Sequence, residues 1–482
     1  MADDLKKKTV TGVSWSFVEQ VLTRGVNFVI GIILARLLSP TDYGLVGMIS
    51  VFIAVSQIFI DGGLSNALIR TKEPSEKDYS TVFFINVVLS LLFYFILLFA
   101  AKPIADFYNQ PILKPFLRTI ALTLVISSLC SVHNTILNIR VDFKTKSYIS
   151  VITAVISGGA GIFCAYKGYG VWALAVQSVG ATIVSTILLI ALVRWWPKAG
   201  FSKESFHRLF SYSSKLLASG LIRAIYDNAY NIVIGKKFSA ASLGQYSRAS
   251  QFPTVANSTL TSTFNRVAFP ILSKIQDDNK RLIGVYEKYI QLFCFVMFPI
   301  LLWMCGCARP FVLFLLTEKW VECIPLLQVL CFSLLINGVT SINLNLLYVK
   351  GRSDLVLRLE VIKKTIAVII LFTSMFFGLM AMCIGQVVFS FIDFGLNTYY
   401  TKKILNYGLG AQLKSMAPYF LCSAVIMSEG LLLSHFIETP WISLTASIII
   451  CPVTYWLISK ALHLYAYQEA SELVRDKLVR NE

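Results

Sequence analysis

The stretch YSTVFFINVVLSLLFYFILLFAA, residues 79–101, decides the class of fold. It contains no charged residue and is long enough for an α-helix to cross about 30 Å of hydrocarbon. Similar runs recur along the whole chain, whereas an outer-membrane barrel would alternate apolar and polar residues in strands of about ten. The sequence therefore predicts an all-α polytopic membrane protein.

The composition of the 482-residue chain supports this class. Hydrophobic residues make up 56% and charged residues 14%, whereas soluble domains carry about 25% charged residues. A soluble globular protein and a disordered chain are therefore excluded. The ten cysteines are scattered through apolar runs without a C-x-x-C, and the four histidines have no ligand spacing, so neither a disulfide framework nor a metal site is predicted.

We predict about 14 transmembrane helices joined by short loops, with turn residues such as Ser39–Asp42 in the breaks. No loop leaves room for a folded extramembrane domain. The basic start of the chain lacks a signal-peptide cleavage site, so the first apolar run is expected to remain as a span. The predicted spans are residues 11–37, 43–66, 79–101, 115–138, 146–166, 169–193, 208–235, 241–270, 287–315, 324–348, 355–377, 379–401, 415–436 and 440–461.

The predicted topology explains the net charge of +17. Lysine and arginine concentrate in alternate loops and at both ends, for example at Lys6–Lys8, Arg140–Lys146 and Arg475–Arg480. Cytoplasmic loops carry such an excess, so both termini are expected in the cytoplasm. Because topology accounts for the charge, no nucleic-acid partner is predicted.

An internal repeat divides the chain. Residues 14–55 and 214–255 match at a constant offset, with identities such as Ser39/Ser239 and Gly44/Gly244, and residues 137–168 weakly match 347–378. Each half holds six predicted spans, which is typical of parallel repeats that enclose a transport pathway. We therefore predict an N-terminal six-helix lobe (1–200), a C-terminal six-helix lobe (201–410), and two extra transmembrane helices with a cytosolic tail (411–482).

Ionisable residues inside the predicted spans point to function. A charged side chain at mid-membrane costs about 2.5–3.5 kcal/mol on insertion scales, so it must pair, reach the interface or face water. In span seven, Lys215, Arg223, Asp227 and Asn231 are spaced by multiples of four and share one helix face. Polar stripes also mark spans one, two and eight, so the stripes are expected to line a hydrated, net positive cavity that favours an anionic guest.

The predicted site has two parts. The cationic cavity is assigned to Arg24, Asn27, Lys215, Arg223, Asn231, Arg248 and Arg266. Charge pairing or coupling to H⁺ or Na⁺ is assigned to Glu19, Asp61 and Asp227. Asp227 can pair with Arg223 at i, i+4, and either Asp61 or Glu19 could pair with Arg24.

Structural roles are the alternative for several of these residues. Arg24 and Arg223 could form buried pairs, and Arg248 and Arg266 could lie near helix ends and extend to the interface. Asp393, in a later span, is expected to make an interhelical hydrogen bond. The sequence contains no P-loop and no nucleophile–base cluster, so neither a cofactor nor an enzymatic activity is predicted.

The N-terminal third resembles a known family. Trp15, Arg24, the segment ARLLSPTDYG (Ala35–Gly44), Asp61 with two glycines, and Ala67–Arg70 are similar to the bacterial polysaccharide transporters, which include O-antigen and capsule flippases and colanic-acid-type exporters. These belong to the superfamily of the multidrug and toxin extrusion carriers and the lipid II flippase. The resemblance extends over essentially the whole chain.

The resemblance implies a two-lobed, V-shaped carrier of twelve core helices, with two extra spans at 415–461. Its substrate would be an isoprenyl-diphosphate-linked oligosaccharide flipped across the bacterial inner membrane, and glycan polymerases or glycosyltransferases would be partners. One alternative is a drug or small-molecule antiporter, which would need an acidic cavity for cations. Another is a membrane glycan polymerase or ligase, which would need a large periplasmic loop that the sequence lacks.

Overall fold

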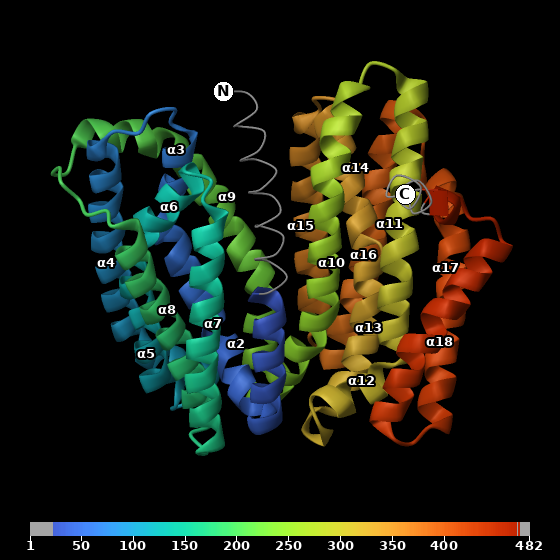
Figure 1. Ribbon diagram of the computed structural model, residues 1–482, viewed down its shortest axis with the longest axis horizontal. Coiled ribbons are helices and arrows are strands. Elements are labelled where there is room, and N and C mark those ends of the chain that lie inside the picture. Colours follow the sequence, from blue (N-terminus) through green and yellow to red (C-terminus); the bar gives the residue numbers. More distant parts are fainter. Residues whose placement is uncertain (1–22, 470, 473–482) are drawn as a thin grey trace, which may run out of the picture. The chain divides into compact units, whose positions relative to one another are not determined.

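The computed structural model describes residues 23–469, 471 and 472, and this part of the chain is helical without any strand (Figure 1). The predicted all-helical class is therefore confirmed. Residues 23–37 form the first described helix. It is followed by α2 (Pro40–Asp61), α3 (Leu64–Arg70), α4 (Glu76–Tyr108), α5 (Leu113–Ser128), α6 (Ser131–Ile139), α7 (Phe143–Tyr166), α8 (Val171–Val193), α9 (Lys203–Lys237), α10 (Ala240–Lys274), α11 (Asn279–Gly306), α12 (Ala308–Leu315), the 3-10 turn η1 (Glu318–Trp320), α13 (Cys323–Leu335), α14 (Asn337–Val349), α15 (Ser353–Ser374), α16 (Leu379–Leu405), α17 (Leu409–Phe436) and α18 (Pro440–Ala461).

Local sequence sets where the helices begin. Ser39 caps α2: the backbone N–H of Asp42 donates to its hydroxyl, and the Asp42 carboxylate accepts from the Ser39 N–H at 2.9 Å. Pro40 occupies the first helical position, where a missing N–H costs nothing. Ser75 and Asp78 form the same reciprocal cap on α4. The predicted turn at Ser39–Asp42 is confirmed, because this capping box starts the helix that follows.

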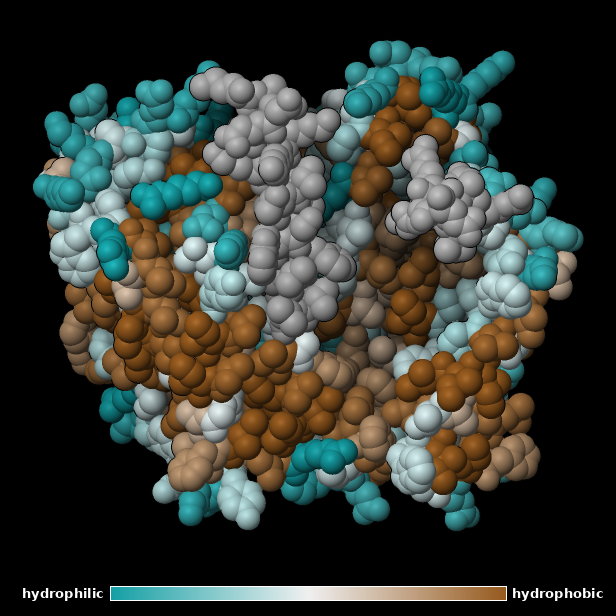
Figure 2. All heavy atoms as spheres, in the orientation of Figure 1, coloured by the Kyte–Doolittle hydropathy of each residue, from teal (hydrophilic) through white to brown (hydrophobic). Residues whose placement is uncertain are grey.

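Most helices are apolar enough to cross a membrane. In the described part of the chain, nine helices or continuous helix pairs qualify by length and composition, and the bent pair α5–α6 makes a tenth. Hydrophobic residues cover the middle of the first unit's visible surface, and hydrophilic residues gather toward the helix ends (Figure 2). The chain is thus a multi-pass membrane protein. The other four predicted spans fall on residues 11–37, of which only 23–37 are described, and on the more polar helices α9, α10 and α15.

The contacts divide the chain into two compact units, one ending at Gly244 and the other beginning at Gln245. This boundary differs from the predicted one at residue 200, because α9 packs against α2, α3 and α4 of the first unit. In the second unit α17 packs along α11 and against α18. The division at 200 and 410 rests on the sequence repeat and stays a prediction.

Two glycines allow the first turns of α2 and α10 to meet. A Cβ at Gly44 would overlap the backbone carbonyl of Ala240, and a Cβ at Gly244 would overlap the carbonyl of Pro40. Each glycine therefore touches the first residue of the other helix, and the offset of 200 relates both members of the contact.

Candidate functional site

The polar face of α9 is exposed within its unit. Lys215, Arg223 and Asp227 are exposed and Asn231 is half-buried, whereas the other face of α9 packs against α2, α3 and α4. Arg223 Nε lies 3.4 Å from Asp227 Oδ2, which confirms the predicted pair at i, i+4. The structure therefore gathers four of the predicted site residues into one polar stripe on a long helix, which we call the α9 stripe.

The remaining predicted cations occupy different surroundings. Arg24 is exposed on the helix over residues 23–37, and Arg266 is exposed on α10. Arg248 is instead buried in the second unit: its Nη1 lies 2.6 Å from Gln251 Oε1, and its guanidinium lies 5.9 Å from the centre of the Trp320 ring. Arg248 is therefore held by protein contacts. Contact of any of them with a substrate stays a prediction.

Glu19 lies outside the described residues, and Asn27 and Asp61 line two separate polar pockets of the first unit. The pocket with Asn27, about 410 Å³ in volume, is called the Asn27 pocket. It is lined by Thr23, Asn27, Ser150, Thr153, Ala154, Ser157, Gln177, Ser178, Ala181 and Ser185. None of these residues carries a charge. The buried hydroxyls of Thr23 and Thr153 have no partner among the described residues, so the pocket can both donate and accept hydrogen bonds.

The pocket with Asp61, about 320 Å³ in volume, is called the Asp61 pocket. It is lined by Gln57, Ile60, Asp61, Ser65, Asn86, Ser127, Ser128, Cys130, Ser131, Asn134, Thr135 and Asn138. Asp61 is the one charged side chain among these described residues. The pocket lies where α2 gives way to α3 and where α5 bends by 45° into α6. Ser127, Ser128 and Ser131 were not among the predicted site residues, although a serine cluster inside span four is a signal that could have singled them out.

The second unit holds a buried ion pair between α15 and α16. Lys363 Nζ lies 2.9 Å from Asp393 Oδ1 and 2.8 Å from Glu360 Oε1. Asn397 Nδ2 also donates to Asp393 Oδ1, at 3.0 Å. The interhelical contact predicted for Asp393 is confirmed. Lys363 was missed, although a lysine inside the predicted span 355–377 is the kind of residue that must have a partner in a membrane.

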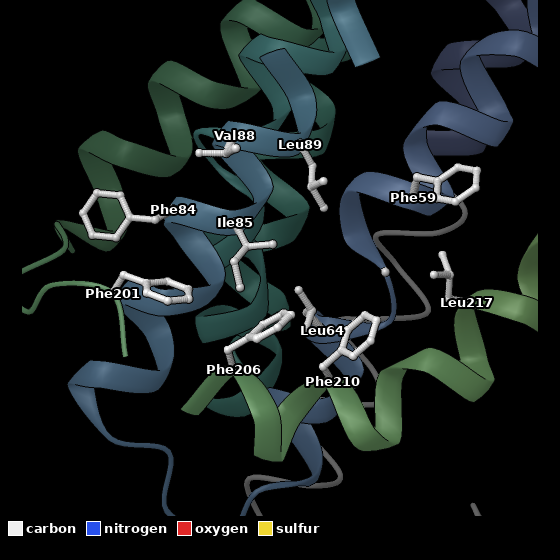
Figure 3. A pocket seen from close by; sticks show the side chains of 11 residues that line it. Phe59, Leu64, Phe84, Ile85, Val88, Leu89, Phe201, Phe206, Phe210 and Leu217 are labelled. Atoms are coloured by element: carbon white, nitrogen blue, oxygen red, sulfur yellow. The ribbon is translucent and has the colours of Figure 1, made fainter. Parts of the chain in front are cut away.

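An apolar pocket of about 660 Å³ lies elsewhere in the first unit. Figure 3 shows side chains of α2, α4 and α9 converging on it, including Phe59, Ile85 and Phe206, with Phe201 from the segment before α9. Its lining offers almost no polar surface. Such a pocket can hold hydrocarbon and cannot bind a charged or hydroxylated group.

Nothing in the described part of the chain groups three or more His, Cys, Asp or Glu side chains for a metal ion. All ten cysteines are free, and nine of them are buried. The cysteines therefore pack as small apolar side chains, as their place in apolar runs predicts.

Solved structures share this fold. The lipid II flippase MurJ in an inward closed conformation matches with a TM-score of 0.72 at 14% identity, over 93% of this chain and 98% of that chain. An inward-facing multidrug resistance MATE family transporter matches with a TM-score of 0.59 at 15% identity, over 80% of this chain and 95% of that chain. At these identities the likeness establishes the common fold.

Sequence relatives point to one biosynthetic context. The lipopolysaccharide biosynthesis protein WzxC of Escherichia coli (strain K12) is 27% identical over 365 residues, covering 74% of this chain and 73% of the relative. The teichuronic acid biosynthesis protein TuaB of Bacillus subtilis (strain 168) is 25% identical over 440 residues, covering 90% and 91%. The family model described as "polysaccharide biosynthesis protein" matches residues 33–325, more than half of the chain. The chain therefore belongs to the polysaccharide biosynthesis protein family.

Proposed function

We propose that this chain is a flippase that moves isoprenyl-diphosphate-linked oligosaccharide or polysaccharide repeat units across the bacterial inner membrane by alternating access. It would move its substrate without covalent chemistry. Relatives named for lipopolysaccharide and teichuronic acid biosynthesis, and a shared fold with a lipid II flippase, support the substrate class and the reaction.

The observation that carries the proposal is the α9 stripe. A helix of 35 residues that exposes Lys215 and Arg223 belongs to a chain most of whose other long helices are apolar enough to cross a membrane. Exposure of these charges to lipid would be costly, so the stripe is expected to face water along the transport path. A diphosphate is multiply anionic, and a guanidinium matches its oxygens with two parallel hydrogen bonds.

Two further features support a lipid-linked sugar. The apolar pocket beside Phe206 offers contact for hydrocarbon, and the uncharged Asn27 pocket offers donors and acceptors that suit sugar hydroxyls. The proposed topology has fourteen spans with both termini in the cytoplasm. It rests on the excess of lysine and arginine in alternate loops and on the lengths of α9, α10 and α15, which contain 35, 35 and 22 residues.

Reconstituted liposomes provide the test. The full-length protein is inserted with an isoprenyl-diphosphate-linked trisaccharide in both leaflets, and a membrane-impermeant glycosidase measures how fast the inner pool reaches the outer leaflet. The wild type should speed this exchange, and Arg223→Ala should lose most of the acceleration. An equal rate in protein-free vesicles would refute the proposal.

Lys72→Ala is the matched control, because Lys72 is an exposed cation in the loop before α4, outside the α9 stripe. It removes the same charge as Arg223→Ala and should leave the rate unchanged. Equal losses in the two variants would mean that overall charge, rather than the α9 stripe, matters for flipping. A drug-efflux assay in cells distinguishes the flippase from the antiporter alternative. The flippase proposal expects that neither the wild type nor Arg223→Ala confers drug resistance.

A further inference from the structure

The hydroxyl groups of the Asp61 pocket present oxygen lone pairs rather than protons. Ser65 Oγ donates its proton to Asp61 Oδ1 at 2.6 Å. The other four hydroxyls donate to backbone carbonyls of their own helical segments: Ser127 to Leu124, Ser128 to Val125, Ser131 to Ser128 and Thr135 to Ser131. A hydroxyl has one proton and two lone pairs, so these five groups can only accept a further partner.

Asn86 adds an acceptor that has no partner. The residue is fully buried, and its Nδ2 donates to Ser131 Oγ at 2.8 Å. Because the Ser131 proton is committed to Ser128, the amide must turn its nitrogen toward Ser131. Asn86 Oδ1 is left without a hydrogen bond among the described residues. A buried acceptor in this state costs free energy unless a donor or a cation satisfies it.

Two helix C-termini, whose last carbonyls carry a partial negative charge, lie at the same place, and the N-termini of α3 and α6 that follow carry the opposite partial charge. Asp61 is the last residue of α2, and Gly62 and Gly63 after it have φ of +52° and +75°. Ser128 is the last residue of α5, directly before the 45° bend. The C-terminal end of a helix carries a partial negative charge and favours cations. Broken helices supply ion sites in membrane transporters for this reason.

We propose that the Asp61 pocket is a binding site for an alkali metal cation, with Na⁺ as the ion. A carboxylate, an amide oxygen and hydroxyl oxygens are the ligands that hard cations prefer. The single charge of Asp61 matches a monovalent ion. Lys146 Nζ touches the lining at Asn138 Oδ1, 3.1 Å away. This ammonium bonds to Asn138 and not to Asp61. Among the described residues Asp61 has no ammonium or guanidinium partner, and a bound cation would supply that charge.

Binding of ²²Na⁺ tests the proposal directly. Purified full-length protein in nanodiscs should bind ²²Na⁺ saturably, and unlabelled Na⁺ but not choline should displace it. Asp61→Asn should abolish this binding. Asp106→Asn is the matched control, because Asp106 is an exposed aspartate of the same unit outside the pocket, and it should bind like the wild type. Equal binding by the two variants, or no saturable binding by the wild type, would overturn the proposal.

A gain-of-function variant decides the case even if Asp61→Asn fails to fold. Asn86→Asp places a second carboxylate at the unpartnered oxygen with almost no change of shape. A second carboxylate raises the preference for divalent ions, because ligand charge tunes their affinity. Asn86→Asp should therefore acquire ⁴⁵Ca²⁺ binding that Na⁺ displaces, and the wild type should not. An Asn86→Asp protein that is folded, but binds no Ca²⁺ and binds Na⁺ like the wild type, would refute the site.

The proposal that the Asp61 pocket binds Na⁺ does not depend on the proposed function. A role for Na⁺ in driving transport does rest on the proposed function. The two can fail separately. Saturable Na⁺ binding in a protein that flips no lipid-linked saccharide would refute the proposed function and keep the site. Flipping by a protein that binds no Na⁺ would refute the Na⁺ site and keep the proposed function.

Discussion

Asp61 in the first compact unit and Asp393 in the second both lie within membrane-spanning segments, and their surroundings differ. Asp393 in the second unit is paired with the buried Lys363 at 2.9 Å. Asp61 in the first unit faces a pocket whose described lining contains neither lysine nor arginine. The comparison teaches that Asp393 has its countercharge within the protein, as Asp78 of the first unit has in Arg208, whereas the Asp61 pocket leaves room for one from solution.

The hydrogen bonds around the two carboxylates differ in the same way. Around Asp393, Lys363 also reaches Glu360 and Asn397 donates to Asp393, so the charges and hydrogen bonds are satisfied by the protein. Around Asp61, Ser65 donates one bond and the other hydroxyl protons point elsewhere. A satisfied buried pair stabilises a fixed helix packing, and an incompletely satisfied pocket can exchange a ligand.

Removal of the built-in countercharge should have the largest effect. Lys363→Met leaves Asp393 buried without a cation, which costs about 3–5 kcal/mol of unfolding free energy. Denaturant unfolding in detergent measures this loss. The double variant Lys363→Met/Asp393→Leu should recover most of the stability, and Asp61→Asn in Na⁺-free buffer should cost less than about 1 kcal/mol. A Lys363→Met protein as stable as the wild type would show that the two carboxylates do not differ as described.

A second prediction is that the surroundings of Asp393 can be converted into a Na⁺ site like the one proposed at Asp61. Lys363→Ala in an Asp61→Asn background opens space beside Asp393 and removes the proposed Na⁺ site. NaCl, but not choline chloride, should then stabilise the protein by about 1–2 kcal/mol at 10 to 30 times the dissociation constant. Thermal unfolding at matched ionic strength measures the shift. The same stabilisation in Asp61→Asn alone would mean that Na⁺ acts elsewhere.

The two carboxylates each have a neutral donor, so a matched pair of variants sharpens the comparison. Ser65→Ala removes the donor that orients Asp61 and should weaken Na⁺ binding about tenfold, with little loss of stability. Asn397→Ala removes a donor to Asp393 and should cost about 1 kcal/mol of stability while Na⁺ binding stays the same. Titration with ²²Na⁺ and denaturant unfolding distinguish these outcomes, and the opposite assignment of effects would contradict the comparison.

The smallest effect is expected at the exposed pair of the α9 stripe. Arg223 and Asp227 are 83% and 55% exposed at their side chains. Exposed pairs at i, i+4 contribute about 0.3–0.5 kcal/mol, so Asp227→Asn should shift the unfolding free energy by no more than this. Unfolding at low and high salt measures it, and a loss above about 1 kcal/mol would place Asp227 with Asp393 among the structural carboxylates.

The sequence predicted much of the framework from local patterns. Continuous apolar runs predicted the helices, Ser39–Asp42 predicted the break before α2, and the spacing of Arg223 and Asp227 predicted their pair. These features depend on residues at most four positions apart. Arg248 illustrates the limit, because its contact with Trp320 joins positions 72 residues apart that no periodicity relates.

The sequence by itself determined the helical membrane class, the α9 stripe and the family, because these follow from composition, short-range spacing and alignment with relatives. Only the tertiary structure decided which carboxylate has a cation beside it. Lys363 meets Asp393 across two helices, and Asn86, Ser131 and Asp61 meet around one pocket formed by two broken helices. Such meetings depend on how helices pack, and the orientation of a donor or acceptor within a pocket depends on partners that are distant in the chain.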